Sequence, residues 1–350
     1  MLKKWMFAAL SVLLLLAGCG GGQDAVKEHK ERQIVGEAKG EFPYSYPLTG
    51  EGTVIEPQAR AVAVVINNHP QARPQSGLHK ADIIYELLAE GEVTRFLAIY
   101  QSEQEGVVGP VRSARHYHIE LAKGYGALFI AHGYSPQAKR MLDSGYINHI
   151  NGMQYDGTLF KRSSARRAPH NSYISFENIY KGAERLHYAM NTPPSPLKFL
   201  SSDEIDNLTG TEAARATVAF SKNPSFHASF KFDEELGKYK RYVGNTVTAD
   251  LETGEPVLLD NVLIIEASHR VLDQAGRREI NLTSGGPAYL LQNGLWRKLE
   301  WRNIDGRILP FENGEIAGLV PGKTWICVIP KSPGLEGAVT LDLKPSGQDG

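Results

Sequence analysis

Arginines gather in the polar loops of the first half of the chain, and arginine is well suited to hold an anion. Arg112 and Arg115 lie three residues apart in Gly109–Arg115, so they share a face if this segment opens a helix. Planar guanidinium forks beside the unsatisfied N–H groups of a helix start suit a phosphate or a carboxylate. Other loops of the same half could bring further basic side chains to this place. We therefore predict a ligand-binding set made of Arg73, Arg112, Arg115, Arg166, Arg167 and His170.

The same arginines have a structural alternative, in which neighbouring side chains hold them in place. The candidates for this supporting role are Asp82, Glu86, Glu90 and Arg95. Exposed ion pairs contribute about 0–1 kcal/mol each, which is little reason to place so many arginines in loops for stability alone. The sequence leaves both interpretations open, a ligand site and a set of structural ion pairs.

Metal binding and nucleophilic catalysis are only weakly indicated. His116 and His118 are two residues apart, so on a helix they point in different directions and cannot share a metal ion. Neither Ser76 nor Ser113 lies in a G-x-S-x-G nucleophile elbow. We predict no metal site and no cofactor, and the sequence leaves catalysis undecided.

Predicted strands and helices alternate around these loops. Apolar runs at 61–66 and 127–131 predict strands buried on both faces, and 82–87 and 95–100 predict two strands joined by a hairpin loop at 89–92. If the first two strands are parallel, the loops that follow them open on the same rim of the sheet. This half is predicted to be a mixed α/β sandwich. Its predicted helices cover 114–123, 136–142 (with Ser135 as N-cap) and 175–188.

The proline-rich stretch 191–196 marks a change of pattern, because proline cannot continue a helix. Beyond it, Asn293-Gly294, Asp305-Gly306 and Asn313-Gly314 favour the positive φ angles of tight hairpin turns. The fold class is therefore α+β, with an α/β domain at 46–192 and a smaller, mostly antiparallel β domain at 193–350. Short alternating runs predict its strands at 226–232, 238–243, 257–265, 288–292, 296–301 and 325–329.

The beginning of the chain has the layout of a lipoprotein signal. Two lysines precede an apolar stretch that is too short to span a bilayer, since a spanning helix needs roughly 20 apolar residues. Leu16-Ala17-Gly18-Cys19 then places small residues before a thiol that can accept diacylglycerol. We predict a signal peptide at 1–18, a lipidated Cys19, and a flexible tether over 19–45.

Composition narrows the classes of partner. The chain carries 38 Lys and Arg against 39 Asp and Glu, and this balance does not point to nucleic acid. Cys327 lies in an apolar run and is predicted to be a buried thiol. The predicted location is the extracytoplasmic face of the cell membrane. The predicted partners are the membrane, through diacylglycerol on Cys19, and an unidentified envelope ligand or protein.

Several blocks of the sequence resemble the YerB-like lipoprotein family. In the first half they are Arg73–Leu78, Ala81–Glu86, Thr94–Phe96, Gly109–Arg115 and Ala168–Asn171. In the second half they are Tyr239–Arg241, Asp260–Val262, Asn293–Trp296 and Pro321–Ile326. The resemblance covers nearly all of the chain after Cys19. It implies a lipid-anchored, two-domain protein, mainly of Gram-positive bacteria, and it brings no established activity.

The leading hypothesis is a non-catalytic envelope binding module whose Arg-rich loops hold an anionic ligand or a protein partner. One alternative is an envelope enzyme acting on phosphodiesters or peptidoglycan, with Arg112, Arg115 and His170 around the reacting group. Another is a scaffold with no small-molecule site. An enzyme needs a base or nucleophile within hydrogen-bond reach of the arginines, whereas a binding module does not.

Replacing Cys19 by Ala removes the thiol that accepts the lipid, so the variant should lose its membrane retention while keeping its fold. Membrane fractions washed with salt and carbonate measure retention, and circular dichroism checks the fold. Unaltered retention of Cys19→Ala would contradict the predicted anchor.

Overall fold

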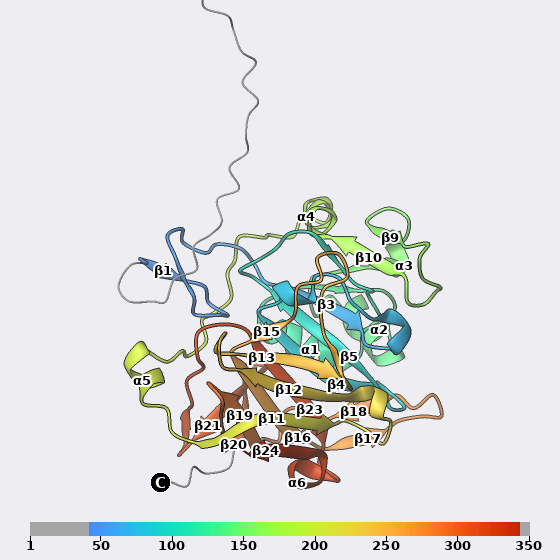
Figure 1. Ribbon diagram of the computed structural model, residues 1–350. Coiled ribbons are helices and arrows are strands. Elements are labelled where there is room, and N and C mark those ends of the chain that lie inside the picture. Colours follow the sequence, from blue (N-terminus) through green and yellow to red (C-terminus); the bar gives the residue numbers. More distant parts are fainter. Residues whose placement is uncertain (1–41, 344–350) are drawn as a thin grey trace, which may run out of the picture. The chain divides into compact units, whose positions relative to one another are not determined.

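The computed structural model describes residues 42–343, most of whose regular structure is β-strand (Figure 1). The predicted signal peptide, Cys19 and most of the predicted tether lie outside the described residues. At the end of the predicted tether, Tyr44–Ser45 forms strand β1, which pairs with β2 (Gly52–Thr53).

The first half of the chain builds one end of a long mixed sheet. The sequence predicts the mixed strand directions of this half but not that its sheet continues into the second half. Its strands lie in the spatial order β8 (His149–Asn151), β7 (Leu128–Ala131), β3 (Val62–Asn67), β5 (Val93–Tyr100) and β4 (Ile83–Glu90). β3 and β8 run parallel to β7, whereas β5 runs antiparallel to both β3 and β4. Because β3 and β7 are parallel, their carboxyl ends lie at the same edge of the sheet.

The second half of the chain continues this sheet. β23 (Thr324–Pro330) lies between β4 and β16 (Asn261–Ala267) and runs parallel to both. Antiparallel strands follow in the order β19 (Gly286–Gln292), β20 (Leu295–Ile304), β21 (Arg307–Glu312) and β22 (Glu315–Ile316). The two halves therefore share one sheet, and the division of the chain between residues 192 and 193 stays a prediction.

The hairpin turns of the second half form where the sequence predicts them. Asn293, Asp305 and Asn313 have φ angles of 48°, 53° and 52°, and each is followed by a glycine with positive φ. This backbone twist matches that of the strands on either side of a two-residue turn. The turn dipeptides therefore set the register of the strand pairs β19–β20, β20–β21 and β21–β22.

A second sheet is built around β11 (Thr211–Ala219), a strand that the sequence analysis missed. β11 pairs with β12 (His227–Asp233) and with β24 (Val339–Leu343), and its first residues also pair with β20. β13 (Lys238–Val243) extends this sheet and carries the short strands β14 (Thr246–Val247) and β15 (Leu258–Leu259). Alanine has low strand propensity, so partner strands rather than local sequence make the Ala-rich β11 a strand.

Each face of the main sheet is covered by its own apolar cluster. Along β3, Val62, Val64 and Ile66 belong to one cluster and Ala63 and Val65 to the other, as the alternation of a strand requires. The first cluster is completed by β12, β13 and helix α4 (Phe176–Arg185), and the second by helices α1 (His116–Gly124) and α2 (Pro136–Asp143). Both faces of the sheet are thus buried, which explains its continuous apolar strands.

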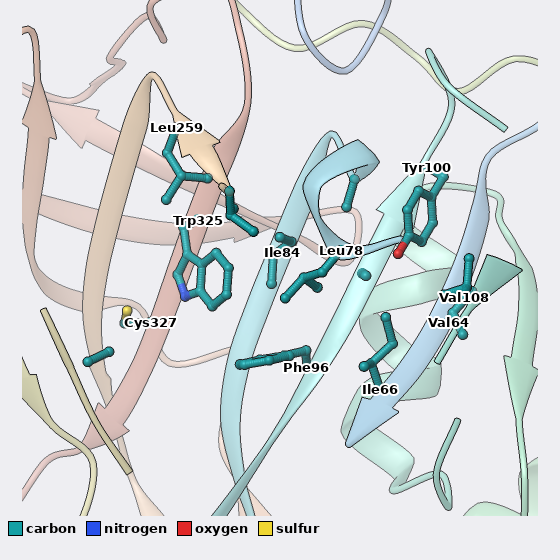
Figure 2. Close-up of a cluster of buried hydrophobic side chains, with 14 of the residues drawn as sticks. Val64, Ile66, Leu78, Ile84, Phe96, Tyr100, Val108, Leu259, Trp325 and Cys327 are labelled. Atoms are coloured by element: carbon teal, nitrogen blue, oxygen red, sulfur yellow. The ribbon is translucent and has the colours of Figure 1, made fainter. Parts of the chain in front are cut away.

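Figure 2 shows part of the first cluster, where Phe96 and Trp325 face each other from neighbouring parts of the sheet. Their ring centroids lie 5.1 Å apart in an edge-to-face arrangement. Cys327 lies in the same cluster as a fully buried free thiol, which confirms the sequence prediction. Burial raises the pKa of the Cys327 thiol well above its usual range.

The helices follow the sequence predictions with shifted ends. α1 begins at His116 rather than at 114, and α2 begins behind the predicted Ser135 cap, whose side chain accepts from Ala138 N. α4 ends at Arg185, because His187 adopts a left-handed φ of 56°. The prediction that this helix continues through Tyr188 is therefore wrong. Within residues 42–343, no helix combines the length and the apolar character needed to cross a membrane.

The remaining elements are short. A small sheet contains β6 (Val107–Val108), β10 (Ser172–Ser175) and β9 (Phe160–Arg162), and β17 (His269–Val271) forms a hairpin with β18 (Arg278–Ile280). The other helical turns are η1 (Pro70–Ala72), η2 (Leu78–Lys80), α3 (Gly152–Tyr155), α5 (Ser202–Asp206), η3 (Pro224–Phe226) and α6 (Gly334–Ala338).

A buried ion pair joins the two sheets. Glu86 of β4 is fully buried, and both of its carboxylate oxygens lie 3.0 Å from Nη2 of Arg241 in β13. The guanidinium of Arg241, itself buried, lies over the rings of Phe96 and Trp325 at 5.2 and 4.8 Å from their centroids. Removing either charge would leave the other without its counter-ion in an apolar interior.

Glu86→Gln and Arg241→Met should therefore each lower the free energy of unfolding by about 3–5 kcal/mol, because each leaves an uncompensated buried charge. The double variant contains neither charge, so its loss of unfolding free energy should be much smaller than the sum of the losses in the two single variants. Urea unfolding of the four proteins measures this coupling. Glu279→Gln, which breaks an exposed pair with Arg270, is the matched control and should cost less than about 1 kcal/mol. Additive losses in the double variant would contradict the role given to the pair.

Candidate functional site

Polar side chains meet at the carboxyl ends of the parallel strands β3 and β7. Asn67 is the last residue of β3, and His132 comes directly after β7. The segment before α1 runs along the end of β3, because Arg112 N donates to Val65 O at 2.8 Å and His132 N donates to Arg112 O at 3.0 Å. This edge of a sheet is where α/β proteins commonly place their ligands. We call Asn67, His69, Arg112, His132 and His170 the rim cluster.

Asn67 fixes two histidines of the rim cluster. Its Oδ1 accepts the backbone N–H of His69 at 2.9 Å, so its Nδ2 faces and donates to Nδ1 of His170 at 2.8 Å. The rings of His69 and His170 stack, with centroids 4.6 Å apart and planes inclined by 25°. A buried amide at the end of β3 thus orients residues from two loops that are far apart in the sequence.

The hydrogen bonds of these rings determine which nitrogen carries the proton. An amide N–H can only donate, so Nδ1 of His170 is an acceptor. Nδ1 of His69 likewise accepts the backbone N–H of Gln71 at 3.2 Å. In the neutral state both rings therefore carry hydrogen on Nε2, and within residues 42–343 neither Nε2–H has a hydrogen-bond acceptor. Both are available as donors to a ligand.

The Arg112 side chain is half-buried, and its guanidinium has no hydrogen bond or ion pair with another residue of 42–343. Its Nε is buried without a hydrogen-bond partner among the described residues. The Glu90 carboxylate acts on Arg112 electrostatically, but its two oxygens are bonded to Arg95 and Arg115. Arg112 is thus a partly desolvated cation, and burial lowers its pKa.

The guanidinium of Arg112 acts on all three histidines of the rim cluster. The pKa of His69 is lowered by burial and then by Arg73 and Arg112. Burial, the neighbouring His69 ring and Arg112 lower the pKa of His170, and burial, Arg162 and Arg112 lower that of His132. The three imidazoles therefore stay neutral near pH 7, and the positive charge of the rim cluster comes from arginine.

Glu90 organises the arginines beside the rim cluster. It binds Arg95 and, at 2.5 Å, Nη2 of Arg115. Although burial alone would raise the pKa of Glu90, the two guanidinium groups hold it below its usual range. Arg95 Nη1 also donates to Ser113 O at 2.6 Å, which ties this group to the segment that carries Arg112.

The β17–β18 hairpin of the second half holds the turn that follows Glu90. Gly91 N donates to Gly276 O at 3.0 Å, and Arg278 Nη2 donates to Gly91 O at 2.6 Å. Gly276 has a φ of +72°, and a Cβ there would lie 2.8 Å from Gly91 N. A glycine is therefore required for the close approach of the two hairpins.

Of the predicted ligand-binding residues, Arg73 and Arg166 are engaged in holding loops. Arg73 Nε donates to Asn68 Oδ1 at 2.9 Å, and its guanidinium lies over the ring of Phe226. Arg166 donates to Ala72 O at 2.8 Å and to Pro74 O at 2.7 Å, which fastens its loop to the one that contains Arg73. Arg167 is exposed.

The predicted supporting residues are spread along β4 and β5. Glu90 and Arg95 stand beside the rim cluster, as described above. Glu86 lies inside the core, where it also accepts from Asn68 Nδ2 at 3.1 Å and Thr94 Oγ1 at 3.0 Å. Asp82 precedes β4 at the opposite end of the strand, where its carboxylate accepts from the backbone and side chain of Ser102. It has no contact with the rim cluster.

His132 stands in a chain of polar side chains. Its Nδ1 lies 2.7 Å from Ser172 Oγ, and its Nε2 lies 3.0 Å from Nη2 of Arg162, which is paired with Asp156. A guanidinium can only donate, so Nε2 is the acceptor and the neutral ring carries its hydrogen on Nδ1. His132 therefore donates to Ser172.

Asn67 and His69 were not predicted as site residues, although the sequence predicted that the loop after the strand at 61–66 lies on the rim of the sheet. Their position directly after a buried strand is a signal that could have found them. No such signal marks Arg241 in the sequence, because its pairing with Glu86 depends on contacts between distant strands.

Cavities elsewhere do not involve these residues. A cavity of about 450 Å³ is lined by Glu177, Tyr180, Lys181, Glu184, Tyr188 and Met190, and another of about 140 Å³ lies on the second sheet. Within residues 42–343, no group of three or more His, Cys, Asp or Glu side chains is arranged to hold a metal ion.

Comparisons with known proteins identify relatives of the whole chain. Residues 48–189 match the "Protein of unknown function (DUF3048) N-terminal domain", and residues 216–326 match the corresponding C-terminal domain. The chain is 42% identical over 333 residues to "Putative lipoprotein YerB" of Bacillus subtilis (strain 168), which covers 94% of this chain and 96% of that protein. The crystal structure of YerB from Bacillus subtilis is similar to it with a TM-score of 0.79 and 42% identity, over 85% of this chain and 99% of that one. As its sequence blocks predicted, the chain belongs to the DUF3048 family of YerB-like proteins.

Proposed function

We propose that this chain is a lipid-anchored protein of the extracytoplasmic membrane face that binds an anionic envelope ligand at Arg112. The lipobox ending at Cys19 supports the anchor, and so does the name of the Bacillus subtilis relative. The binding function rests on the site alone, because the family has no assigned activity.

One observation carries the binding proposal: Arg112 is a half-buried guanidinium without an acceptor among the described residues. Arg95 and Arg115 share the Glu90 carboxylate, so the region holds more positive than negative charge. A partly desolvated cation favours a bound anion more strongly than a fully hydrated one does. His69 and His170 add neutral N–H donors, which can bond to an anion without a change in protonation.

The polar chain through His132 supports binding rather than nucleophilic catalysis. A catalytic serine needs a neighbouring base that accepts its proton. His132 instead donates to Ser172, because Arg162 occupies its accepting nitrogen. Ser172 is also fully buried, so a large substrate could not reach its hydroxyl group.

Arg112→Ala should weaken binding of simple anions such as sulfate and acetate about 10- to 100-fold, the loss expected for a hydrogen bond to a charged group. The measurement is a titration of the full chain in neutral detergent, followed by the NMR signals of its histidine side chains. The His69 and His170 signals should shift on addition of anion in the wild type.

Arg140→Ala is the matched control, because Arg140 is an exposed arginine of α2. It should bind anions as the wild type does. Equal anion affinity of Arg112→Ala and Arg140→Ala would contradict a site at Arg112.

A further inference from the structure

We infer that the ligand group held at Arg112 is the dianion of a phosphate monoester. This inference rests on the binding function proposed above and assigns the chemical class of the ligand. It follows from the number and separate origins of the donors, from the charge of the rim cluster and from its access to solvent.

The donors come from three separate segments of the chain. His69 follows β3, Arg112 precedes α1, and His170 lies between β9 and β10. A carboxylate is planar, so one guanidinium fork in its plane satisfies both oxygens. A terminal phosphate has three oxygens, one for each of a guanidinium and two separate imidazole N–H donors. A phosphodiester has only two such oxygens.

The charge around Arg112 suits two negative charges better than one. The site contains three positive guanidinium groups, those of Arg95, Arg112 and Arg115, and the negative carboxylate of Glu90. Arg73 and Arg166 act on the rings of His69 and His170 from neighbouring loops. Burial and the neighbouring arginines lower the pKa of each of the three histidines, so at pH 7 the positive charge of the site comes from arginine.

A ligand can reach these groups from solvent. His69, Arg112 and His170 are each partly exposed, and the stacked rings keep both Nε2–H groups without an acceptor among the described residues. A phosphate at the end of a larger molecule could bind here while the rest of that molecule stays outside.

Four small anions separate the possibilities when titrated into the full chain in neutral detergent. Glycerol 1-phosphate is a phosphate monoester, sulfate is a tetrahedral dianion, dimethyl phosphate is a diester monoanion and acetate is a planar monoanion. We expect the first two to bind at pH 7 at least roughly tenfold more tightly than the others, because each gains a further charge-assisted hydrogen bond. Arg112→Ala should remove this preference, and Arg140→Ala should keep it.

Lowering the pH provides a second criterion. A phosphate monoester has its second pKa near 6, so the dianion fraction, and with it the affinity for glycerol 1-phosphate, should fall about tenfold between pH 7 and pH 5. Sulfate keeps its charge, and its affinity should not fall. Two results would overturn the phosphate assignment while supporting an anion site at Arg112. The first is Arg112-dependent binding without a preference for the dianions, and the second is an equal pH dependence for sulfate and glycerol 1-phosphate. If none of the four anions shows Arg112-dependent binding, both the assignment and the proposed function fail.

Discussion

The ion pair between Glu86 and Arg241 is the interaction on which the arrangement of the two sheets depends. It places one charge from each half of the chain inside an apolar core, where neither is stable without the other. The guanidinium of Arg241 also lies over the aromatic rings of Phe96 and Trp325. Because Glu86 lies on β4 and Arg241 on β13, forming the pair requires the second sheet to dock in one position on the first. A pair of apolar residues in the same places would tolerate more than one docking position.

The same pair connects the second half of the chain to the rim cluster. Glu86 accepts a hydrogen bond from Asn68, whose neighbour Asn67 orients His69 and His170. The β17–β18 hairpin supplies a second support, because it holds the turn that follows Glu90. The rim cluster thus consists of first-half residues, while the second half fixes the loops and charges around them.

Much of the fold could be predicted from the sequence, because apolar runs and Asn-Gly or Asp-Gly turns are local signals. β3, β4, β5 and β7 follow from such runs. β11 could not be predicted, since its Ala-rich sequence becomes a strand only between its partners. The same limit applies to the site. Arginines in loops were visible in the sequence. However, Arg115 binds Glu90 whereas Arg112 makes no ion pair within the described part of the chain, and this distinction depends on tertiary contacts. The pairing of Glu86 with Arg241 spans 155 residues and leaves no pattern in either segment.

We propose that Arg112 and the stacked histidines form an anion site at the carboxyl ends of β3 and β7. A crystal structure of the protein soaked in tungstate tests it most directly, because tungstate is a tetrahedral dianion that is easily located by its anomalous scattering. We expect a tungstate ion within hydrogen-bond distance of the Arg112 guanidinium and of Nε2 of His69 and His170. Tungstate bound elsewhere on the protein, with this rim left empty, would contradict it.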